Sequence, residues 1–185
     1  MSLNKNNIVE FLLDIFERRG ADSYLGEAVT MSEHMLQCAE CAAADGADSE
    51  LIAAALLHDI GHYTNEFPDD ALEQGIDNHH DSAGGSILAG FFSERISECV
   101  RLHVLAKRYL CAVEADYFAK LSPASVHTLN LQGGPMSKAE ISEFTANSYH
   151  QDAIRVRRWD EAGKTKGVIT RNIRDFEPLL QSLLV

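Results

Sequence analysis

The sequence predicts an all-α fold in one domain, and three observations support this prediction. Strand signals are nearly absent, whereas helix start and stop signals recur along the whole chain of 185 residues. Hydrophobic residues make up 45% of the chain, which is typical of a globular protein with a buried core. No internal repeat, low-complexity tract or interdomain linker divides the sequence, so we expect a single domain over residues 1–185.

The first helices are predicted by apolar spacing and by capping residues. Apolar side chains at helical spacing predict a helix over residues 6–19, and Gly20 follows as a stop signal. A second helix is expected from about Glu27 to Ala44. Asp48 is a suitable N-cap for the Ala- and Leu-rich stretch 50–59, because its side chain can accept a hydrogen bond from an unpaired backbone N–H.

The rest of the chain alternates loops with further helices. Residues 63–77 contain Pro and Gly and are expected to form a surface loop. Ser122 followed by Pro123 predicts a helix start, and Ser137 with Glu140 matches a capping box. The other expected helices cover about His80–Gly90, Ser93–Tyr109, a stretch from Tyr149 that carries Asp160, and Asp175–Leu184.

The formal net charge of -12 argues against a protein that binds nucleic acid regardless of sequence, because such proteins need Lys and Arg to neutralise phosphates. A small anionic substrate is still compatible with this charge, since a local positive pocket can override the overall field. No apolar run approaches the roughly 20 residues that span a bilayer, and the first residues lack the layout of a signal peptide. We therefore expect a cytoplasmic protein that contacts neither nucleic acid nor membrane.

Cys38 and Cys41 form a C-x-x-C pair within a helical pattern, without a second pair, and are interpreted as small core residues.

The strongest functional signal is a His-Asp pair at the end of an apolar helical run, in residues 56–62 (LLHDIGH). Neighbouring side chains on a helix point about 100° apart, so one metal cannot easily use both from a regular helix. Near the helix end, His58 can bind one metal while the Asp59 carboxylate bridges to a second. An isolated pair of this kind would be interpreted as a helix-terminal His beside an exposed Asp.

The pair is accompanied by other residues that commonly bind metals. His34 lies upstream on an expected helix, His80 opens a later one, and His103 lies on the helix after that. Asp160 follows late in the chain, and His79 competes with His80 for the same role. Each of these residues alone would more often lie on the surface or in the core than bind a metal. Their order and spacing together favour a metal centre.

This order resembles the HD-domain superfamily, whose pattern is His, then His-Asp, then Asp. On this resemblance, His34, His58 and Asp160 hold one metal, His80 and His103 hold the other, and Asp59 is the bridge. His80 is preferred to His79 because residues 80–84 (HDSAG) are more similar to the third motif of the superfamily.

Most members of this superfamily hydrolyse phosphate esters, but several segments resemble the HD-domain organophosphonate oxygenases, relatives of myo-inositol oxygenase. The resemblance covers nearly the whole chain, and Leu102 is a departure from it that lies outside the ligand set. The segments are residues 24–27 (YLGE), 34–38 (HMLQC), 54–63 (AALLHDIGHY), 103, 106–110 (AKRYL), 131–136 (LQGGPM) and 158–161 (RWDE).

The resemblance implies two iron ions, Fe(II) and Fe(III), and O2 as a substrate. The organic substrate would be a 1-hydroxy-2-aminoethylphosphonate whose amine is free, N-methylated or trimethylated. Cleavage of its carbon–phosphorus bond would release phosphate and either glycine or a betaine. Carbon is a poor leaving group, so hydrolysis does not easily break this bond, and this is a chemical reason for redox-active iron.

The resemblance also implies roles for residues around the metals. Lys107 lies on the same helix face as His103, and a cation beside a metal ligand suggests a bound anion. His62 would lie near the substrate hydroxyl without binding metal, and Arg158 is the rival of Arg157. The implied phosphonate contacts are Lys107, Ser125, Thr128, Gln132 and Arg157.

Tyr24 and Glu27 are implied to form a gate. The tyrosine could occupy the metal position meant for O2 until substrate binds, while the glutamate accepts the amino group. A quaternary ammonium would instead favour aromatic faces. The aromatic residues available by sequence are Tyr24, Tyr63, Phe67 and Trp159.

Two other functions are compatible with the same ligands. A metal-dependent phosphohydrolase acting on a nucleotide or another phosphate ester would share all of them, and only iron content and O2 consumption would separate it from an oxygenase. A non-catalytic signalling module is disfavoured because the ligand set is intact and no output domain is attached.

Overall fold

The computed structural model describes residues 3–24, 26–65, 67–68, 71–72 and 74–185. Within these ranges the protein is helical, and its only β pairing is an isolated bridge between Ser23 and Thr30, which confirms the all-α prediction. The elements are α1 (Ile8–Arg19), α2 (Met31–Ala44), α3 (Ser49–Leu57), η1 (Ile60–Tyr63), α4 (His80–Leu88), α5 (Glu94–Val113), η2 (Phe118–Lys120), α6 (Pro123–Leu131), α7 (Lys138–Ala146), α8 (His150–Ala162), η3 (Ile173–Phe176) and α9 (Glu177–Ser182), where η denotes a 3-10 helix.

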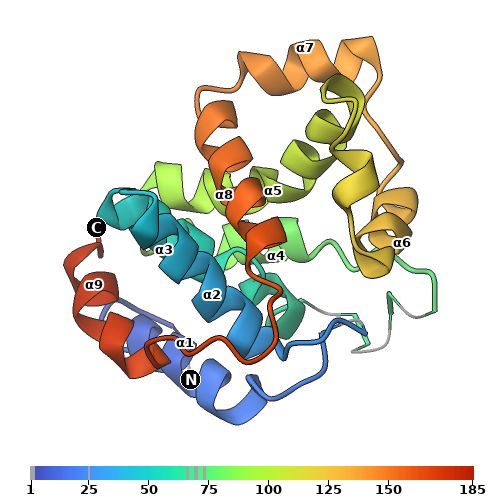
Figure 1. The fold of residues 1–185 in the computed structure, drawn as a ribbon. Coiled ribbons are helices and arrows are strands. Elements are labelled where there is room, and N and C mark those ends of the chain that lie inside the picture. Colours follow the sequence, from blue (N-terminus) through green and yellow to red (C-terminus); the bar gives the residue numbers. More distant parts are fainter. Residues whose placement is uncertain (1–2, 25, 66, 69–70, 73) are drawn as a thin grey trace.

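The long helix α5 is central to the packing. It contacts α4, α8 and α3, while α2 packs against α3 and α8 (Figure 1). Helices α1 and α9 lie together near both termini, and α7 lies at the opposite end of the molecule (Figure 1). The larger apolar core lies among α1–α5, α8 and α9, and a smaller core joins α5, α7 and α8. The helices α2, α3, α5 and α8 therefore meet in the interior, where they can bring distant residues together.

Capping explains where most helices begin. The side chains of Asp48, Ser122 and Ser137 accept backbone N–H groups as predicted, and Ser137 with Glu140 forms both arms of the capping box. These caps satisfy N–H groups that have no partner within the helix.

The expected start of the second helix at Glu27 is wrong, because α2 begins at Met31. A second capping box causes the difference: Thr30 Oγ1 accepts the Glu33 N–H at 3.2 Å, and Glu33 Oε2 accepts the Thr30 N–H at 2.8 Å. Tyr24 and Glu27 instead lie in the preceding loop, joined by a backbone hydrogen bond from the Glu27 N–H to the Tyr24 carbonyl at 2.7 Å. Leu25, in the same motif, lies outside the described residues.

Tyr63 ends η1, and the described residues between 64 and 77 form a loop as predicted, but this loop is not entirely on the surface. Ala71 and Leu72 are buried. His127 on α6 donates from Nε2 to the Leu72 carbonyl at 2.9 Å, which ties the loop to α6. Residues 66, 69, 70 and 73 of this loop lie outside the described part of the chain.

Smaller differences concern helix ends and cysteines. The α3 helix ends at Leu57, two residues earlier than expected, and α5 continues to Val113. Cys38 is fully buried on α2 and Cys41 is half-buried, both without a disulfide. Among the described helices, we find none with the length and apolar character needed to cross a membrane.

Gly61 allows η1 to pack directly on the start of α4. A Cβ atom at this position would lie 1.7 Å from the His80 carbonyl oxygen and 2.7 Å from the Gly84 backbone nitrogen. We expect Gly61→Ala to push η1 and α4 apart and to lower the free energy of unfolding by about 1–3 kcal/mol, measured by denaturant unfolding. Gly90→Ala is the matched control, since a Cβ there meets nothing within 4 Å. Equal stability of both variants would contradict this account.

Candidate metal centre and active site

Six predicted metal ligands from separate elements meet in the interior of the bundle. They are at most 5% exposed, which is unusual for such polar side chains unless they are partnered. The six are His34 on α2, His58 and Asp59 directly after α3, His80 at the start of α4, His103 on α5, and Asp160 on α8.

The Asp59 carboxylate lies between two pairs of histidines. Its Oδ2 atom is 3.5 Å from His34 Nε2 and 3.4 Å from His58 Nε2. Its Oδ1 atom is 3.5 Å from His80 Nε2 and 3.4 Å from His103 Nε2. One oxygen therefore faces each pair, which is the arrangement that a bridging carboxylate requires.

Asp160 completes the first group. Its Oδ1 atom lies 3.5 Å from His34 Nε2, and its Oδ2 atom lies 3.9 Å from His58 Nε2. The end of α3 explains how His58 and Asp59 point to different groups: His58 still has helical backbone angles, but Asp59 has φ -99° and ψ 8°.

The four histidines are oriented by hydrogen bonds from their other ring nitrogen. Each Nδ1 atom lies 2.7–3.0 Å from an acceptor oxygen. A proton on Nδ1 that is donated to this oxygen leaves the lone pair on Nε2, the form that binds metals. The acceptors are the backbone carbonyls of Gly163, Ala55 and Val100 for His34, His58 and His103, and Asn78 Oδ1 for His80.

Two buried carboxylate oxygens support a metal at this place. Asp59 Oδ2 and Asp160 Oδ1 have no hydrogen-bond partner among the described residues. A buried acceptor without a partner costs free energy, and a bound cation between these oxygens and the Nε2 atoms would remove that cost. The His and Asp side chains thus fit a metal centre.

The electrostatics are consistent with a site built for cations. Burial, and then the charge of His58, lower the pKa of His34 to about 4. Burial would also lower the pKa of His58, but Asp59 and Asp160 raise it to about 9. The Nε2 atoms of His34 and His58 are 3.1 Å apart, so a proton on one of them lies where a metal ion would contact both. A metal ion would replace that proton.

Cys38 is an additional side chain near the first group. Its Sγ atom lies 3.8 Å from His34 Nδ1 and 3.9 Å from His34 Nε2, so it is about equally far from both ring nitrogens. Burial raises the pKa of the thiol well above its usual range, which disfavours the thiolate that binds metals. Asp160 is the better ligand, and Cys38 remains a core residue.

Asn78 forms hydrogen bonds with two stacked histidines, His62 and His80, and gives them protons on different nitrogens. The rings of His62 and His80 lie 4.0 Å apart. Asn78 Nδ2 donates to His62 Nδ1 at 3.1 Å, and Asn78 Oδ1 accepts from His80 Nδ1 at 3.0 Å. His80 therefore keeps a lone pair on Nε2, whereas neutral His62 carries its proton on Nε2, 3.9 Å from Asp59 Oδ1. This explains why His62 would act as a donor and not as a ligand.

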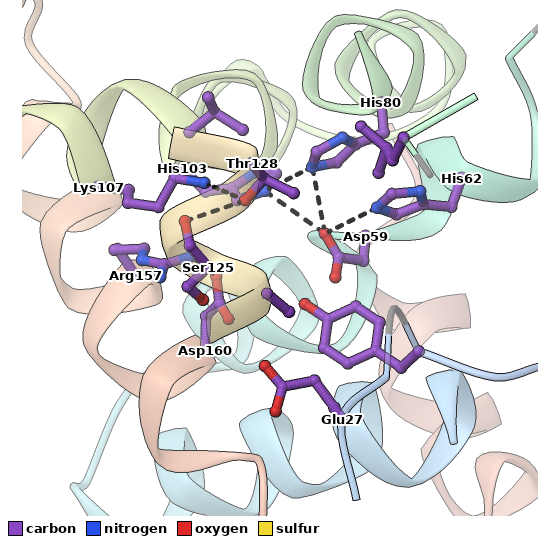
Figure 2. Close-up of a pocket in the computed structure, with 14 residues that line it drawn as sticks. Glu27, Asp59, His62, His80, His103, Lys107, Ser125, Thr128, Arg157 and Asp160 are labelled. Carbon is purple, nitrogen blue, oxygen red and sulfur yellow. Dashed lines mark hydrogen bonds and ion pairs between the residues drawn. The ribbon is translucent and has the colours of Figure 1, made fainter. Parts of the chain in front are cut away.

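A pocket opens beside the Asp59 carboxylate, and Figure 2 shows side chains pointing into it from several elements. It brings together most of the predicted site residues; His34 and His58 do not line it. The predicted residues that line it are Tyr24, Glu27, Asp59, His62, His80, His103, Lys107, Ser125, Thr128, Arg157 and Asp160.

Cations gather on one side of the pocket. Lys107 is only 3% exposed, and its Nζ donates to Thr128 Oγ1 at 2.8 Å. Burial, and then the charge of Arg157, lower the pKa of Lys107 to about 7. Arg157 donates to Asp160, Glu161 and, at 2.9 Å, the Tyr117 hydroxyl. A buried lysine with no carboxylate partner among the described residues suits an anionic ligand.

Tyr24 and Glu27 lie across the pocket from these cations. The Tyr24 ring stacks on His34 with centroids 4.3 Å apart. Burial, and then the charges of Asp59 and Asp160, raise the pKa of Tyr24 well above its usual range. Glu27 accepts a hydrogen bond from the Ser122 hydroxyl. Both residues line the pocket.

Gln132 is the predicted substrate contact that the pocket lining does not include. It follows α6 as its C-cap, and its amide nitrogen and oxygen are buried with no hydrogen-bond partner among the described residues.

The rivals of His80 and Arg157 in the sequence, His79 and Arg158, lie outside the pocket lining. The side chain of His79 is 64% exposed beside Asp77, and Arg158 pairs with Glu114 on the surface.

Several residues that shape the site were missed by sequence reasoning. Asn78, Tyr117, Glu161 and Lys164 all contact predicted site residues. Glu161 and Lys164 are near Asp160 in sequence and could have been noticed for that reason. Nothing local distinguishes Asn78 or Tyr117, because their partners come from other elements.

A helical bundle that buries four His and two Asp residues beside a polar pocket defines a metal-dependent enzyme of the His-Asp type. The HD-domain family matches residues 31–140, and the chain belongs to this family. It is 50% identical over 182 residues to a [1-hydroxy-2-(trimethylamino)ethyl]phosphonate dioxygenase (glycine-betaine-forming) of Leisingera caerulea, covering 98% of this chain and 93% of that protein. It is also 42% identical over 177 residues to a hydroxymethylphosphonate dioxygenase of Gimesia maris, covering 95% and 88%.

Proposed function

We propose that this protein is a dioxygenase that cleaves the carbon–phosphorus bond of a 1-hydroxy-2-aminoethylphosphonate, with a free or N-methylated amine. The observation that carries this proposal is that one pocket joins a His/Asp metal centre to buried cations. Similarity over nearly the whole chain to two phosphonate dioxygenases supports it. The reaction converts the hydroxyl-bearing carbon to a carboxylate and releases phosphate, giving glycine or a betaine. Both atoms of O2 end in the products, so the substrate is oxidised and O2 is reduced without another reductant.

We propose two iron ions as the cofactor. His34, His58 and Asp160 would hold one ion, His80 and His103 the other, and Asp59 would bridge them. Bound there, a redox-active pair would supply the electrons that activate O2, which neither histidine nor carboxylate can do.

The protein side chains would bind and orient the phosphonate. Lys107 and Arg157 supply positive charge, and Ser125 and Thr128 supply hydroxyl groups on one face of α6. His62 would carry its proton on Nε2, which lies near Asp59, and would donate a hydrogen bond to the substrate hydroxyl. Tyr24 would occupy the position meant for O2 until substrate binds, and Glu27 would accept a hydrogen bond from the substrate amino group.

Oxygen uptake tests this proposal directly. Iron-loaded protein is given 2-amino-1-hydroxyethylphosphonate or its trimethylammonium analogue, and O2 consumption and phosphate release are measured together. We expect equal amounts of O2 consumed and phosphate released, and no reaction with the phosphonate that lacks the hydroxyl. Anaerobic release of phosphate from a phosphate ester, with no reaction of hydroxyphosphonates in air, would establish the phosphohydrolase instead.

Lys107→Met should weaken substrate binding and leave the metal in place. Loss of a charge-assisted hydrogen bond is expected to raise KM by about 10–100-fold. The charged form of Lys107 predominates below about pH 7 and is lost as the pH rises above it. The difference in KM between wild type and variant should therefore shrink between pH 6 and pH 8. A difference that does not change over this range would contradict the role of Lys107.

A further inference from the structure

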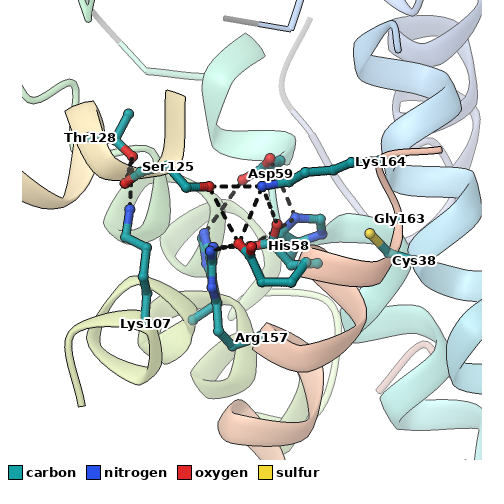
Figure 3. A network of polar contacts seen from close by, with 12 residues as sticks. Cys38, His58, Asp59, Lys107, Ser125, Thr128, Arg157, Gly163 and Lys164 are labelled. Carbon is teal, nitrogen blue, oxygen red and sulfur yellow. Dashed lines mark hydrogen bonds and ion pairs between the residues drawn. The ribbon is translucent and has the colours of Figure 1, made fainter. Parts of the chain in front are cut away.

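Lys164 lies next to the pocket without lining it, and several oxygen atoms surround its ammonium group. It follows the last residues of α8, and its side chain is only 11% exposed. Its Nζ atom donates to Ser125 Oγ at 2.8 Å and lies 3.3 Å from Glu161 Oε1. It also lies 3.7 Å from Glu27 Oε1 and 3.7 Å from Asp160 Oδ1. Figure 3 shows Lys164 reaching from this segment toward Ser125 on α6.

The backbone beside Lys164 is fixed to α2. Gln37 Nε2 donates to the Thr165 carbonyl at 3.0 Å, and the Thr165 N–H donates to Gln37 Oε1 at 3.1 Å. Gln37 is 4% exposed, and one turn before it His34 Nδ1 meets the Gly163 carbonyl at 3.0 Å. The ammonium group of Lys164 is therefore held in place from both sides, which limits the entropy lost when it makes a specific contact.

The two hydroxyl groups on α6 differ in where their protons go. Thr128 Oγ1 accepts from Lys107 and donates to the Ser125 carbonyl at 3.2 Å, so its proton is already used. Ser125 Oγ accepts from Lys164 and donates to Glu161 Oε1 at 3.4 Å, a longer bond than the one that Thr128 donates. That oxygen already accepts from Arg157 and lies near Lys164. Lys164 keeps the Ser125 proton directed away from the ammonium group, and because its present bond is long and the acceptor is shared, this proton can turn toward a ligand in the pocket.

We propose that Lys164 is a positioning residue that fixes Ser125 as a hydrogen-bond donor to the phosphonate group of the substrate. This rests on the proposed function, in which Ser125 faces the phosphonate. Lys164 does not line the pocket, so it acts through Ser125, and a hydroxyl polarised by a cation is a stronger donor. Lys107 donates to Thr128 in the same way, but the Thr128 hydroxyl makes the shorter bond to a protein oxygen, 3.2 Å to the Ser125 carbonyl.

A purely structural role predicts a different result. Lys164 is near the C-terminus of α8 and lies three and four residues after Glu161 and Asp160, where a cation stabilises the helix. If that were its only role, Lys164→Met would lower thermal stability without changing the affinity for a phosphonate.

The test is a double-mutant cycle on the binding of methylphosphonate to metal-loaded protein, measured by calorimetry. We expect Lys164→Met and Ser125→Ala each to weaken binding by about 10-fold, the size of one hydrogen bond to a charged group. The double variant should also be about 10-fold weaker, not about 100-fold, because the two side chains act as one unit. The cycle of Lys164→Met with Thr128→Val should give independent effects.

Two controls keep the result specific. Lys166→Met changes an exposed lysine of the same segment and should bind methylphosphonate like wild type. Metal content should stay the same in all variants. Independent effects of Lys164 and Ser125, or wild-type affinity in Lys164→Met, would overturn the proposal, as would a wild-type protein that does not bind methylphosphonate.

Turnover measurements distinguish a failure of the proposal for Lys164 from a failure of the proposed function. With an active substrate, Lys164→Met should raise KM by about 10-fold and change kcat by less than about twofold, because a ground-state contact is lost. Coupled binding of methylphosphonate without any O2 consumption would refute the dioxygenase and support the role of Lys164. Normal turnover with independent binding effects would refute only the role of Lys164.

Discussion

Asp59→Asn is expected to empty both halves of the metal centre and to reduce turnover by more than about 1000-fold. Loss of a group that only supports a metal ligand already costs about 10–100-fold, and Asp59 faces all four histidines. The amide keeps the shape of the side chain, but it carries no negative charge and offers only one acceptor oxygen. Metal analysis of the purified variant, together with its turnover, measures the effect.

The stability of the metal-free variant distinguishes a functional loss from misfolding. Asp59→Asn should still unfold in a single cooperative transition, and its free energy of unfolding should be about 3–5 kcal/mol lower than that of metal-free wild type, because the charge of His58 loses a buried partner. Asp45→Asn is the matched control, because this side chain is 63% exposed and near Arg155. If Asp59→Asn retained two metals per chain, the bridging role would be refuted.

Removing the metals from wild-type protein should abolish turnover and lower the free energy of unfolding by more than about 4 kcal/mol under conditions where free metal is 1,000 times its Kd. The native state holds the ligands together, whereas the unfolded chain does not, so binding stabilises only the native state. Asp59 Oδ2 and Asp160 Oδ1 also lose the cation that would satisfy them. Denaturant unfolding with and without a chelator measures the difference.

The variant Asp59→Asn provides the internal control for this experiment. A chelator should not change its stability, because it is expected to hold no metal. Readdition of iron should restore both stability and turnover to the wild-type protein. Equal unfolding curves for wild type with and without chelator would show that the His/Asp cluster is not a metal centre.

Local signals were sufficient for most of the fold. Capping residues such as Asp48 and Ser137 act within four residues of the chain, so the sequence alone locates the helix starts. The error at α2 has the same origin: Thr30 and Glu33 form a capping box that outweighs the apolar pattern upstream. The buried part of the 63–77 loop could not be predicted, because Leu72 is held by His127 from α6.

The candidate metal ligands could be proposed from the sequence because their residue types and order match the pattern of the HD-domain family. His34, His58-Asp59, His80, His103 and Asp160 need no knowledge of distances to be recognised as a set. By contrast, Gln132 belongs to a recognised motif, yet its amide does not line the pocket. Sequence resemblance identifies a residue but does not decide the direction of its side chain.

An all-α chain with capped helices and a candidate His/Asp ligand set can be predicted from the residues alone, because helix formation and motif order depend on near neighbours. Only the packed structure shows that Asp59 faces two histidine pairs, that Asn78 contacts both His62 and His80, and that Lys164 reaches Ser125. These contacts join residues from separate elements. Burial and hydrogen-bond direction arise only when those elements pack, and they set the charge and the proton positions of the site.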